Sequence, residues 1–200
     1  MLKYLDGSIR GAVVADCGCG PGLATRRMVL EGASKVCAID ASREMLALIE
    51  DDTRIVKLQS TMEERPLDKL RECEAPEGFD LVLFKRSLYM NTPEALEILN
   101  NAFGHLRPGG CLVVVHPEKK LRPYFFGSPP WFHSYTIPHI INRTSNRLGV
   151  LMGVEKYQLY TREELTALAE EVAGCVEVEA IPSCQQSFNM VAIRNSEEKS

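Results

Sequence analysis

Short apolar runs separated by polar stretches recur through most of the chain. Seven of these runs have the length and composition of strands, and several are apolar on both faces instead of alternating with polar residues. They cover residues 12–16, 35–40, 53–58, 79–84, 111–115, 176–181 and 188–194. Strands that are apolar on both faces are typical of a parallel sheet that helices cover on both sides.

Between the strands, apolar residues follow helical spacing. These stretches cover residues 23–31, 42–50, 66–73 and 93–106, and a further helix is expected from 161 to about 173. Ser42 and Thr92 have the side chains that cap helix N-termini, and Pro93 suits a first helical turn. Thr161 and Glu164 form the pattern of a capping box, which indicates the start of the last helix.

This alternation of strands and helices predicts a doubly wound α/β fold. The first five strands are expected to run parallel because a helix connects each of them to the next. The last two lie close together in the sequence and are expected to pair antiparallel. We therefore predict a mostly parallel, seven-stranded sheet with an antiparallel edge strand.

Residues 116–160 differ from the rest of the chain in composition. They hold eight of the 14 aromatic residues and five of the 11 prolines, which is unlike a regular helix or strand. Six cations against two carboxylates give this segment a net charge of +4, so that the remainder carries −8 of the total of −4. We interpret the segment as a lobe inserted into the α/β core.

Composition and cysteine content narrow the class of protein. The 200 residues are 45% apolar and 25% charged, as in a soluble globular chain. The longest apolar runs have the length of strands, far short of the roughly 20 residues of a membrane-spanning helix, and the first residues lack the pattern of a secretory signal peptide. We therefore expect a cytoplasmic protein with no membrane partner. Seven scattered cysteines without a Cys-x-x-Cys pair fit reduced thiols better than disulfides or a metal site.

A glycine-rich turn follows the first predicted strand. It reads Asp16-Cys-Gly18-Cys-Gly20-Pro-Gly22 and leads into a helix, which is where an open α/β sheet binds its ligand. Glycines allow the backbone to approach a ligand closely, and the helix N-terminus can bind an anionic group. A dinucleotide fingerprint requires its third glycine at the position of Leu23. The spacing therefore favours a different ligand.

This turn resembles the first motif of the class I S-adenosylmethionine-dependent methyltransferases. Four further elements of the chain resemble other parts of the same family. Asp40 ends the second strand 20 residues after Gly20, where the family keeps a carboxylate for the ribose hydroxyls. The polar stretch 60–63 is similar to the family's adenine-facing segment, residues 79–85 to its fourth strand with the element that follows, and residues 106–110 to the turn before its fifth strand. The elements occur in the family's order and at its spacing.

The resemblance implies a Rossmann-like methyltransferase fold with S-adenosyl-L-methionine as the cofactor and no metal. The residues that it places at the cofactor are Asp16, Gly18, Gly20, Gly22, Asp40, Ala41, Thr61, Met62, Glu63 and Lys85. Together with the distinct composition of residues 116–160 and the polar composition of the last residues, it suggests four parts: a cofactor-binding core at 1–115, a substrate or lid lobe at 116–160, a C-terminal helix and strand pair at 161–194 that complete the core, and a disordered tail at 195–200.

Two residues after the fourth strand depart from one branch of the family. Nucleobase amino-methyltransferases have there an Asn, Asp or Ser followed by Pro-Pro and an aromatic residue, whereas this chain has Lys85 and Arg86. The string Ser128-Pro-Pro-Trp131 matches that signature but follows the fifth strand. We interpret it as a chance match and do not expect a flipped-base site.

The expected reaction is an in-line displacement that moves a methyl group to an O, N or S atom. Such a transfer depends mainly on alignment, although an oxygen or sulfur acceptor must also lose a proton. His116, directly after the fifth strand, is one candidate base, and His133 in the lobe is another.

The positive charge of the lobe favours a small, anionic metabolite as the acceptor. Basic residues interleaved with aromatic ones also suit RNA, so an RNA or protein acceptor is the first alternative. A non-catalytic domain that binds the cofactor and activates a partner is the second.

Overall fold

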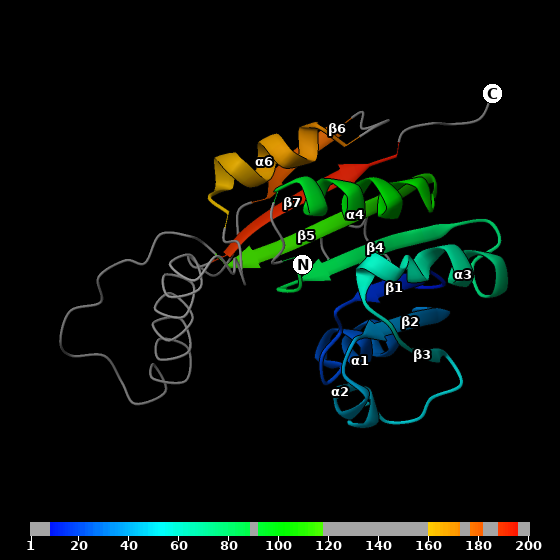
Figure 1. Ribbon diagram of the computed structural model, residues 1–200. Coiled ribbons are helices and arrows are strands. Elements are labelled where there is room, and N and C mark those ends of the chain that lie inside the picture. The colour runs from blue at the N-terminus through cyan, green and yellow to red at the C-terminus, as the bar shows by residue number, and fades with distance from the viewer. Residues whose placement is uncertain (1–8, 89–91, 118–159, 173–176, 182–187, 196–200) are drawn as a thin grey trace, which may run out of the picture.

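The sheet expected from the sequence is present. A computed structural model describes residues 9–88, 92–117, 160–172, 177–181 and 188–195 and contains seven strands in the order β3-β2-β1-β4-β5-β7-β6 (Figure 1). They are β1 Val13–Cys17, β2 Lys35–Asp40, β3 Ile55–Gln59, β4 Phe79–Lys85, β5 Leu106–Pro117, β6 Glu177–Ile181 and β7 Phe188–Arg194. β1 to β5 run parallel, and β7 pairs antiparallel with both β5 and β6, which confirms the predicted fold class. The antiparallel strand β7 stands one place in from the edge strand β6.

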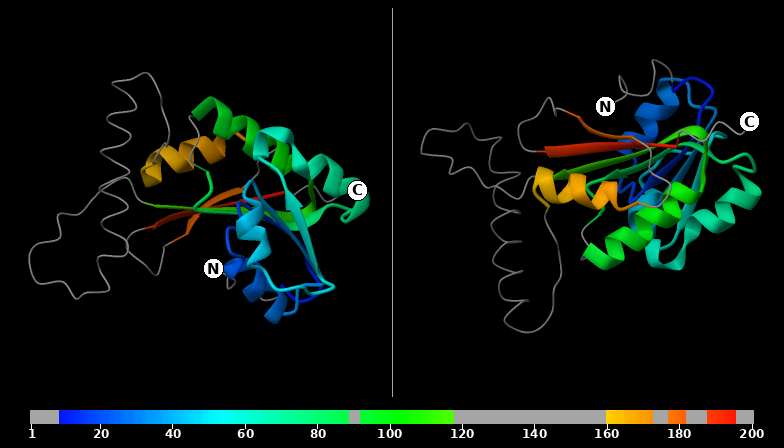
Figure 2. Two further views of the ribbon diagram at one scale, coloured as in Figure 1. Left: turned by 60° about the horizontal axis from the view of Figure 1, so that its bottom comes forward. Right: turned by 90° about the horizontal axis from the view of Figure 1, so that it is seen from above.

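Helices cover both faces of the sheet. They are α1 Leu23–Leu30, α2 Arg43–Ala47, α3 Pro66–Cys73, α4 Thr92–Gly104 and α6 Arg162–Glu170, with a 3-10 turn, η2, at Met62–Glu64. Figure 2 shows α3, α4 and α6 on one face and α1 with α2 on the other. Ser42 caps α2 by accepting a hydrogen bond from the N–H of Met45 at 3.2 Å, and Thr161 and Glu164 form the predicted capping box at α6. α2 is shorter than the stretch 42–50 that was expected to be helical.

Alternate residues of the central strands fill two layers of core between the sheet and its helices. On β4, Val82 and Phe84 pack in the layer with α3, α4 and α6, whereas Leu81 and Leu83 pack in the layer with α1. All four side chains are at most 2% exposed. This burial on both faces is the physical reason for the unbroken apolar run, since each such side chain contributes about 1.5–3 kcal/mol when it leaves water.

The beginning of β5 differs from the prediction. Residues 106–110, expected as a turn before the strand, are part of β5. The register against β4 shifts there, between Phe79 and Leu81 of β4. On the other side, the N–H of Gly109 donates to the carbonyl oxygen of Asn195, directly after β7, at 2.7 Å. Residues 106–110 therefore form a strand because they are bonded to neighbouring strands, although their Pro and Gly content is typical of a turn.

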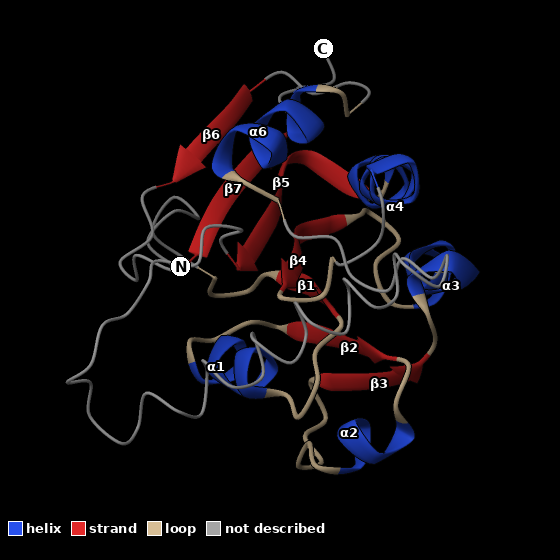
Figure 3. Cartoon of the chain, turned by 60° about the vertical axis from the view of Figure 1, so that its left-hand side comes forward, coloured by secondary structure: helices blue, strands red, loops and turns tan. Residues whose placement is uncertain are grey.

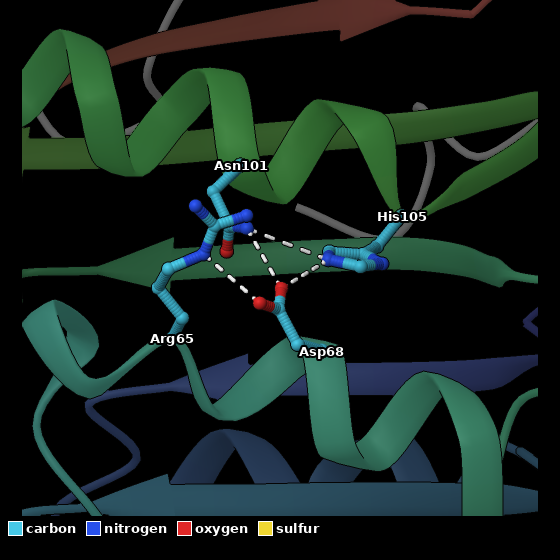
Figure 4. A network of polar contacts seen from close by, with 4 residues as sticks. All are labelled: Arg65, Asp68, Asn101 and His105. Atoms are coloured by element: carbon cyan, nitrogen blue, oxygen red, sulfur yellow. Dashed lines mark hydrogen bonds and ion pairs between the residues drawn. The ribbon is translucent and has the colours of Figure 1, made fainter.

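A polar cluster joins α3 to α4, which lie next to each other on one face of the sheet (Figures 3 and 4). One carboxylate oxygen of Asp68 accepts a hydrogen bond from Nδ2 of Asn101 at 2.9 Å and lies 2.7 Å from Nε2 of His105. The other oxygen accepts one from Nε of Arg65 at 2.9 Å. The hydrogen bond from Asn101, followed by those from His105 and Arg65, lowers the pKa of Asp68. Because Arg65 directly follows η2, the cluster also ties the end of η2 to α4.

Most of the predicted lobe and the tail lie outside the described residues. This applies to residues 118–159, including His133 and the cations of the lobe, and to residues 196–200. Among the described residues, no helix is long and apolar enough to cross a membrane. That part of the chain also contains no group of three or more His, Cys, Asp or Glu that could hold a metal ion.

Candidate functional site

The segments predicted to bind a ligand meet at the carboxyl ends of the parallel strands, where open α/β sheets hold their ligands. The glycine turn after β1 is bonded to the end of β2, since the N–H groups of Gly18 and Cys19 donate to the carbonyl oxygen of Ile39 at 2.8 and 2.9 Å. The turn after β4 lies on the other side of β1, because β1 pairs with both β2 and β4. Three loops that are distant in sequence are thereby brought together.

The carboxylate of Asp40 links the glycine turn to the end of β2. Its Oδ2 accepts a hydrogen bond from the N–H of Gly20 at 2.8 Å, and its Oδ1 accepts one from the N–H of Ser42 at 2.9 Å. A carboxylate oxygen has two acceptor positions, so each oxygen retains one for a hydroxyl of a ligand. The two features that the sequence analysis singled out independently, the glycines and this carboxylate, are therefore in direct contact.

The three glycines of the turn serve two different purposes. All have left-handed backbone, with φ of 70° at Gly18, 54° at Gly20 and 77° at Gly22. A Cβ on Gly18 would overlap with the Cβ of Ser87, and one on Gly22 would stand 2.6 Å from Cγ1 of Ile49. A Cβ on Gly20 would meet no atom within 4 Å. Packing within the protein therefore requires Gly18 and Gly22, whereas Gly20 borders open space.

Asp16, in β1, is bonded to α1. It is 1% exposed, and its Oδ2 accepts a hydrogen bond from the hydroxyl of Thr25 at 2.6 Å. Burial raises the pKa of Asp16 to about 6, although the Thr25 hydrogen bond and the charge of Lys85 act in the opposite direction. Asp16 thus holds the first turn of α1 beside the glycine turn, and its contact with a cofactor stays a prediction.

The stretch expected to face adenine lies beside Asp40. The N–H of Ser60 donates to the backbone carbonyl of Asp40 at 3.2 Å. Thr61 and Glu64 then cap η2 reciprocally, a role that the sequence analysis did not assign to Thr61. Met62, the first residue of η2, is partly buried and packs against the core. Its contact with adenine stays a prediction.

Three other predicted residues border the same region. Ala41, between Asp40 and the cap of α2, is exposed, and so is Glu63 in η2. Lys85 is the last residue of β4, is partly buried, and pairs in register with Val115 of β5. These positions agree with the spacing that the sequence analysis used, while their contacts with a cofactor stay predictions.

The turn after β4 contains two residues to which the sequence analysis gave no role. The hydroxyl of Ser87 donates to the carbonyl oxygen of Cys17 at 2.6 Å, and its Cβ occupies the space that Gly18 leaves open. The N–H of Arg86 donates to the carbonyl oxygen of Val115 at 2.8 Å, and its φ is 60°. Left-handed backbone costs about 1–2 kcal/mol for a residue with a side chain, and such residues gather at functional sites. No local pattern in the sequence could have indicated these contacts between distant segments.

His116, the first candidate base, is 0% exposed near the end of β5. Its ring lies edge to face against that of Tyr160, with centroids 5.2 Å apart and an interplanar angle of 67°. Burial raises the pKa of Tyr160, which is 2% exposed just before α6. In the sheet, β5 lies two strands from β1 and its glycine turn. His133, the second candidate base, lies outside the described residues.

A model of a known protein family matches the part of the chain that holds this site. Residues 14–110 match a family model described as a methyltransferase domain. The matched stretch runs from β1 into β5 and includes the glycine turn, Asp40, η2 and Lys85. A search of curated proteins finds no match.

Solved structures with the same fold include several methyltransferases. An S-adenosylmethionine-dependent methyltransferase from Mesorhizobium loti is 21% identical, with a TM-score of 0.60 over 96% of this chain and 95% of that one. A second one, from Archaeoglobus fulgidus, is 14% identical, with a TM-score of 0.64 over 96% and 89%. Magnesium protoporphyrin IX methyltransferase from Synechocystis, solved with S-adenosylmethionine bound, is 12% identical, with a TM-score of 0.60 over 98% and 76%. These similarities establish the fold.

Proposed function

We propose that the chain is a class I S-adenosylmethionine-dependent methyltransferase with S-adenosylmethionine as its cofactor, and that it transfers the methyl group to an O, N or S atom of a small, negatively charged metabolite. The hydrogen bond between Asp40 and Gly20 carries the proposal, because it brings the carboxylate of β2 to the open side of the glycine turn. An adenosyl group needs both features in one place: acceptors for its hydroxyls and backbone that it can approach closely.

The residues around Gly20 fit this cofactor. In the proposed complex, Asp40 accepts hydrogen bonds from the two ribose hydroxyls, and Met62 packs against the adenine ring between Thr61 and Glu63. The space beside Gly20 that a Cβ would enter is left to the ligand. When bound, the cofactor supplies a sulfonium methyl group that is already activated for transfer.

The other predicted residues shape this site. Gly18 and Gly22 let the turn pack against the loops beside it, and Asp16 holds α1 through Thr25. The backbone at Ala41 extends the ribose side of the site, and the turn that starts at Lys85 borders its methionine end. Together they keep the cofactor in one orientation, and alignment of the reacting groups can contribute about 7–11 kcal/mol to lowering the barrier.

His116 and His133 are the proposed proton acceptors for an oxygen or sulfur nucleophile. A general base must come within hydrogen-bond reach of the proton that it takes, directly or through one water. The burial of His116 against Tyr160 requires the acceptor to enter beside the end of β5, in contact with the ring. A nitrogen acceptor that is already deprotonated needs no base, and alignment alone then suffices.

The charge distribution supports a small, anionic acceptor. Residues 116–160 carry a net charge of +4 in a chain whose total is −4, so the positive charge is concentrated in the segment predicted to be the lobe. The magnesium protoporphyrin IX methyltransferase that shares this fold is named for a small-molecule acceptor. Positive side chains bind carboxylate or phosphate groups through charge-assisted hydrogen bonds, which supports acceptors of that class.

The aromatic residues interleaved with these cations favour RNA as a second candidate acceptor. Phosphate contacts release counterions, so an RNA acceptor predicts binding that weakens steeply as the salt concentration rises. Binding to RNA that is absent, or that does not depend on salt, would remove this alternative. A protein acceptor, or a domain that binds the cofactor without catalysis and activates a partner, are further alternatives.

Incubation with methyl-labelled S-adenosylmethionine and fractionated cell extract tests the proposal. Label in a low-mass compound supports it. Label found only in RNA or protein would show that the acceptor is a macromolecule instead of a small metabolite. Calorimetry with S-adenosylhomocysteine provides the independent measurement of the cofactor site. Cofactor binding without label in any fraction would favour the non-catalytic alternative, and absence of cofactor binding would contradict the site itself.

A further inference from the structure

The turn after β4 holds an arginine in a fixed position beside the proposed cofactor site. We propose that Arg86 binds the negatively charged group of the methyl acceptor, a carboxylate or a phosphate, and so selects acceptors by their charge. The inference rests on the proposed function, and it names the residue that would give that function its specificity for anions.

Hydrogen bonds to the strands on both sides anchor this turn. The N–H of Arg86 donates to the carbonyl oxygen of Val115 on β5 at 2.8 Å, and the hydroxyl of Ser87 donates to that of Cys17 on β1 at 2.6 Å. The next residue, Leu88, is 1% exposed in the core. Between these anchors, Arg86 has the exposed side chain, while Lys85 and Ser87 are partly buried.

The backbone of Arg86 is unusual for an arginine. Its φ of 60° is in the left-handed region, and among the described residues other than glycine only Arg65 shares this property. Arg65 is bonded to Asp68 within the cluster between α3 and α4. Glycine or asparagine would adopt this conformation at Arg86 with less strain. An outlier of this kind supports a functional role for the side chain.

The two consecutive cations of this turn have different surroundings. Lys85 interacts electrostatically with the buried Asp16, and therefore acts on the side of the glycine turn. Arg86 is joined to β5, the strand that holds the candidate base His116 next to its last residue. An acceptor placed between the cofactor and the end of β5 therefore has Arg86 at its border.

The guanidinium group suits this task better than an ammonium group. It is always charged, and its planar fork of N–H donors matches the two oxygens of a carboxylate or phosphate. Because the turn is anchored, its backbone loses little further freedom when the side chain binds a ligand. Arg86 therefore combines fixed charge, planar donors and a fixed backbone at the border of the site.

Three substitutions separate the charge from the backbone conformation. Arg86→Lys keeps the charge without the fork, Arg86→Gln removes the charge, and Arg86→Gly removes the side chain and relieves the strained φ. Arg162→Gln, at the exposed start of α6, is the matched control away from the site. Each protein is assayed for S-adenosylhomocysteine binding and for transfer of labelled methyl to a metabolite extract, whose products are separated by anion exchange.

Wild-type protein and Arg162→Gln should label a compound that the anion exchanger retains. Arg86→Gln and Arg86→Gly should lower that labelling about tenfold or more, and Arg86→Lys by less, because a charge-assisted contact is lost or weakened. Affinity for S-adenosylhomocysteine should stay within about twofold in every variant. The unfolding temperature of Arg86→Gly should not fall, since glycine fits the left-handed backbone, so its lost activity cannot come from unfolding.

A direct binding measurement uses inorganic phosphate as the probe. With saturating S-adenosylhomocysteine, phosphate should raise the unfolding temperature of the wild type but not that of Arg86→Gln. A labelled product that the exchanger does not retain, equal labelling by Arg86→Gln, or no phosphate effect in the wild type would overturn the inference. If S-adenosylhomocysteine itself does not bind, the proposed function fails instead, so the two failures can be told apart.

Discussion

The backbone N–H of Gly20 donates a hydrogen bond of 2.8 Å to the carboxylate of Asp40, which joins the open glycine of the turn to the acidic end of β2. The bond gives Asp40 two tasks in the proposed complex. It fixes the glycine turn, and it offers its remaining acceptor positions to a ribose. Cofactor affinity should therefore depend on Asp40 more strongly than on other carboxylates at the protein surface.

Replacing Asp40 with Ala should weaken S-adenosylhomocysteine binding about tenfold to a hundredfold, because a hydrogen bond to a charged acceptor contributes about 1.5–3 kcal/mol. Asp40→Asn keeps one acceptor oxygen and should lose less. Asp52→Asn is the matched control, since Asp52 is paired with Arg54 outside the site. Calorimetry measures all four proteins, and an affinity that does not change in Asp40→Ala would contradict the proposed site.

Gly18→Ala should mainly lower the stability of the protein, whereas Gly20→Ala should mainly lower its affinity for the cofactor. At Gly18, a Cβ overlaps with Ser87 and left-handed backbone adds strain, so the free energy of unfolding should fall by about 2–4 kcal/mol. At Gly20, only the strain of about 1–2 kcal/mol applies, but the new methyl group enters the space proposed for the ligand. Gly20→Ala should therefore lose more cofactor affinity and less stability.

Urea unfolding and calorimetry separate the two effects. Gly104→Ala is the control for adding a methyl group, because a Cβ there meets no atom within 4 Å. Adding Ser87→Gly to Gly18→Ala should restore the part of the stability that the overlap removed. If Gly18→Ala lost more cofactor affinity than Gly20→Ala, the division of tasks between the two glycines would be wrong.

The distance between interacting residues along the chain decides how much of this molecule can be predicted. The cap at Ser42 and the capping box at Thr161 were predicted correctly because each involves residues three positions apart. The hydrogen bond from Ser87 to Cys17 joins residues 70 positions apart, and no periodicity records it. The left-handed backbone of Arg86 likewise follows from bonds to neighbouring strands, which a local pattern cannot contain.

Asp16 should make the protein less stable as the pH rises from about 4 to about 6. Burial raises its pKa to about 6 in the folded state, against about 3.9 in the unfolded state, so the folded state binds the proton more tightly. The stability from this group is full below about pH 4 and is lost as the pH rises through about 6, by up to about 3 kcal/mol.

Asp16→Asn should remove this dependence, because its amide oxygen can still accept the hydrogen bond from Thr25. Urea unfolding between about pH 4 and pH 8 measures the difference in unfolding free energy between wild type and variant. That difference should shift in favour of Asp16→Asn as the pH rises. Two curves that stay parallel over this range would show that Asp16 does not titrate as expected.

Asp68→Asn should give the opposite sign when urea unfolding is extended below about pH 4. Hydrogen bonds from Asn101, His105 and Arg65 lower the pKa of Asp68, so its stabilising effect is present at neutral pH and is lost as the pH falls below about 4. The side chain of Asp68 is 41% exposed, and solvent should therefore keep the effect smaller than that of Asp16. A larger loss of stability at acid than at neutral pH would contradict the role of the cluster.

His116→Phe tests whether the buried imidazole acts as a base or as part of the core. Phenylalanine keeps an aromatic ring against Tyr160, so the free energy of unfolding should change by less than about 1.5 kcal/mol. If His116 is the base for an oxygen or sulfur acceptor, transfer of labelled methyl should fall about a hundredfold or more, with S-adenosylhomocysteine binding unchanged. Tyr160→Phe keeps the same ring contact and controls for packing in the unfolding measurements. Full transfer activity in His116→Phe would assign the histidine to the core, and would leave either His133 as the proposed base or a nitrogen acceptor that needs no base.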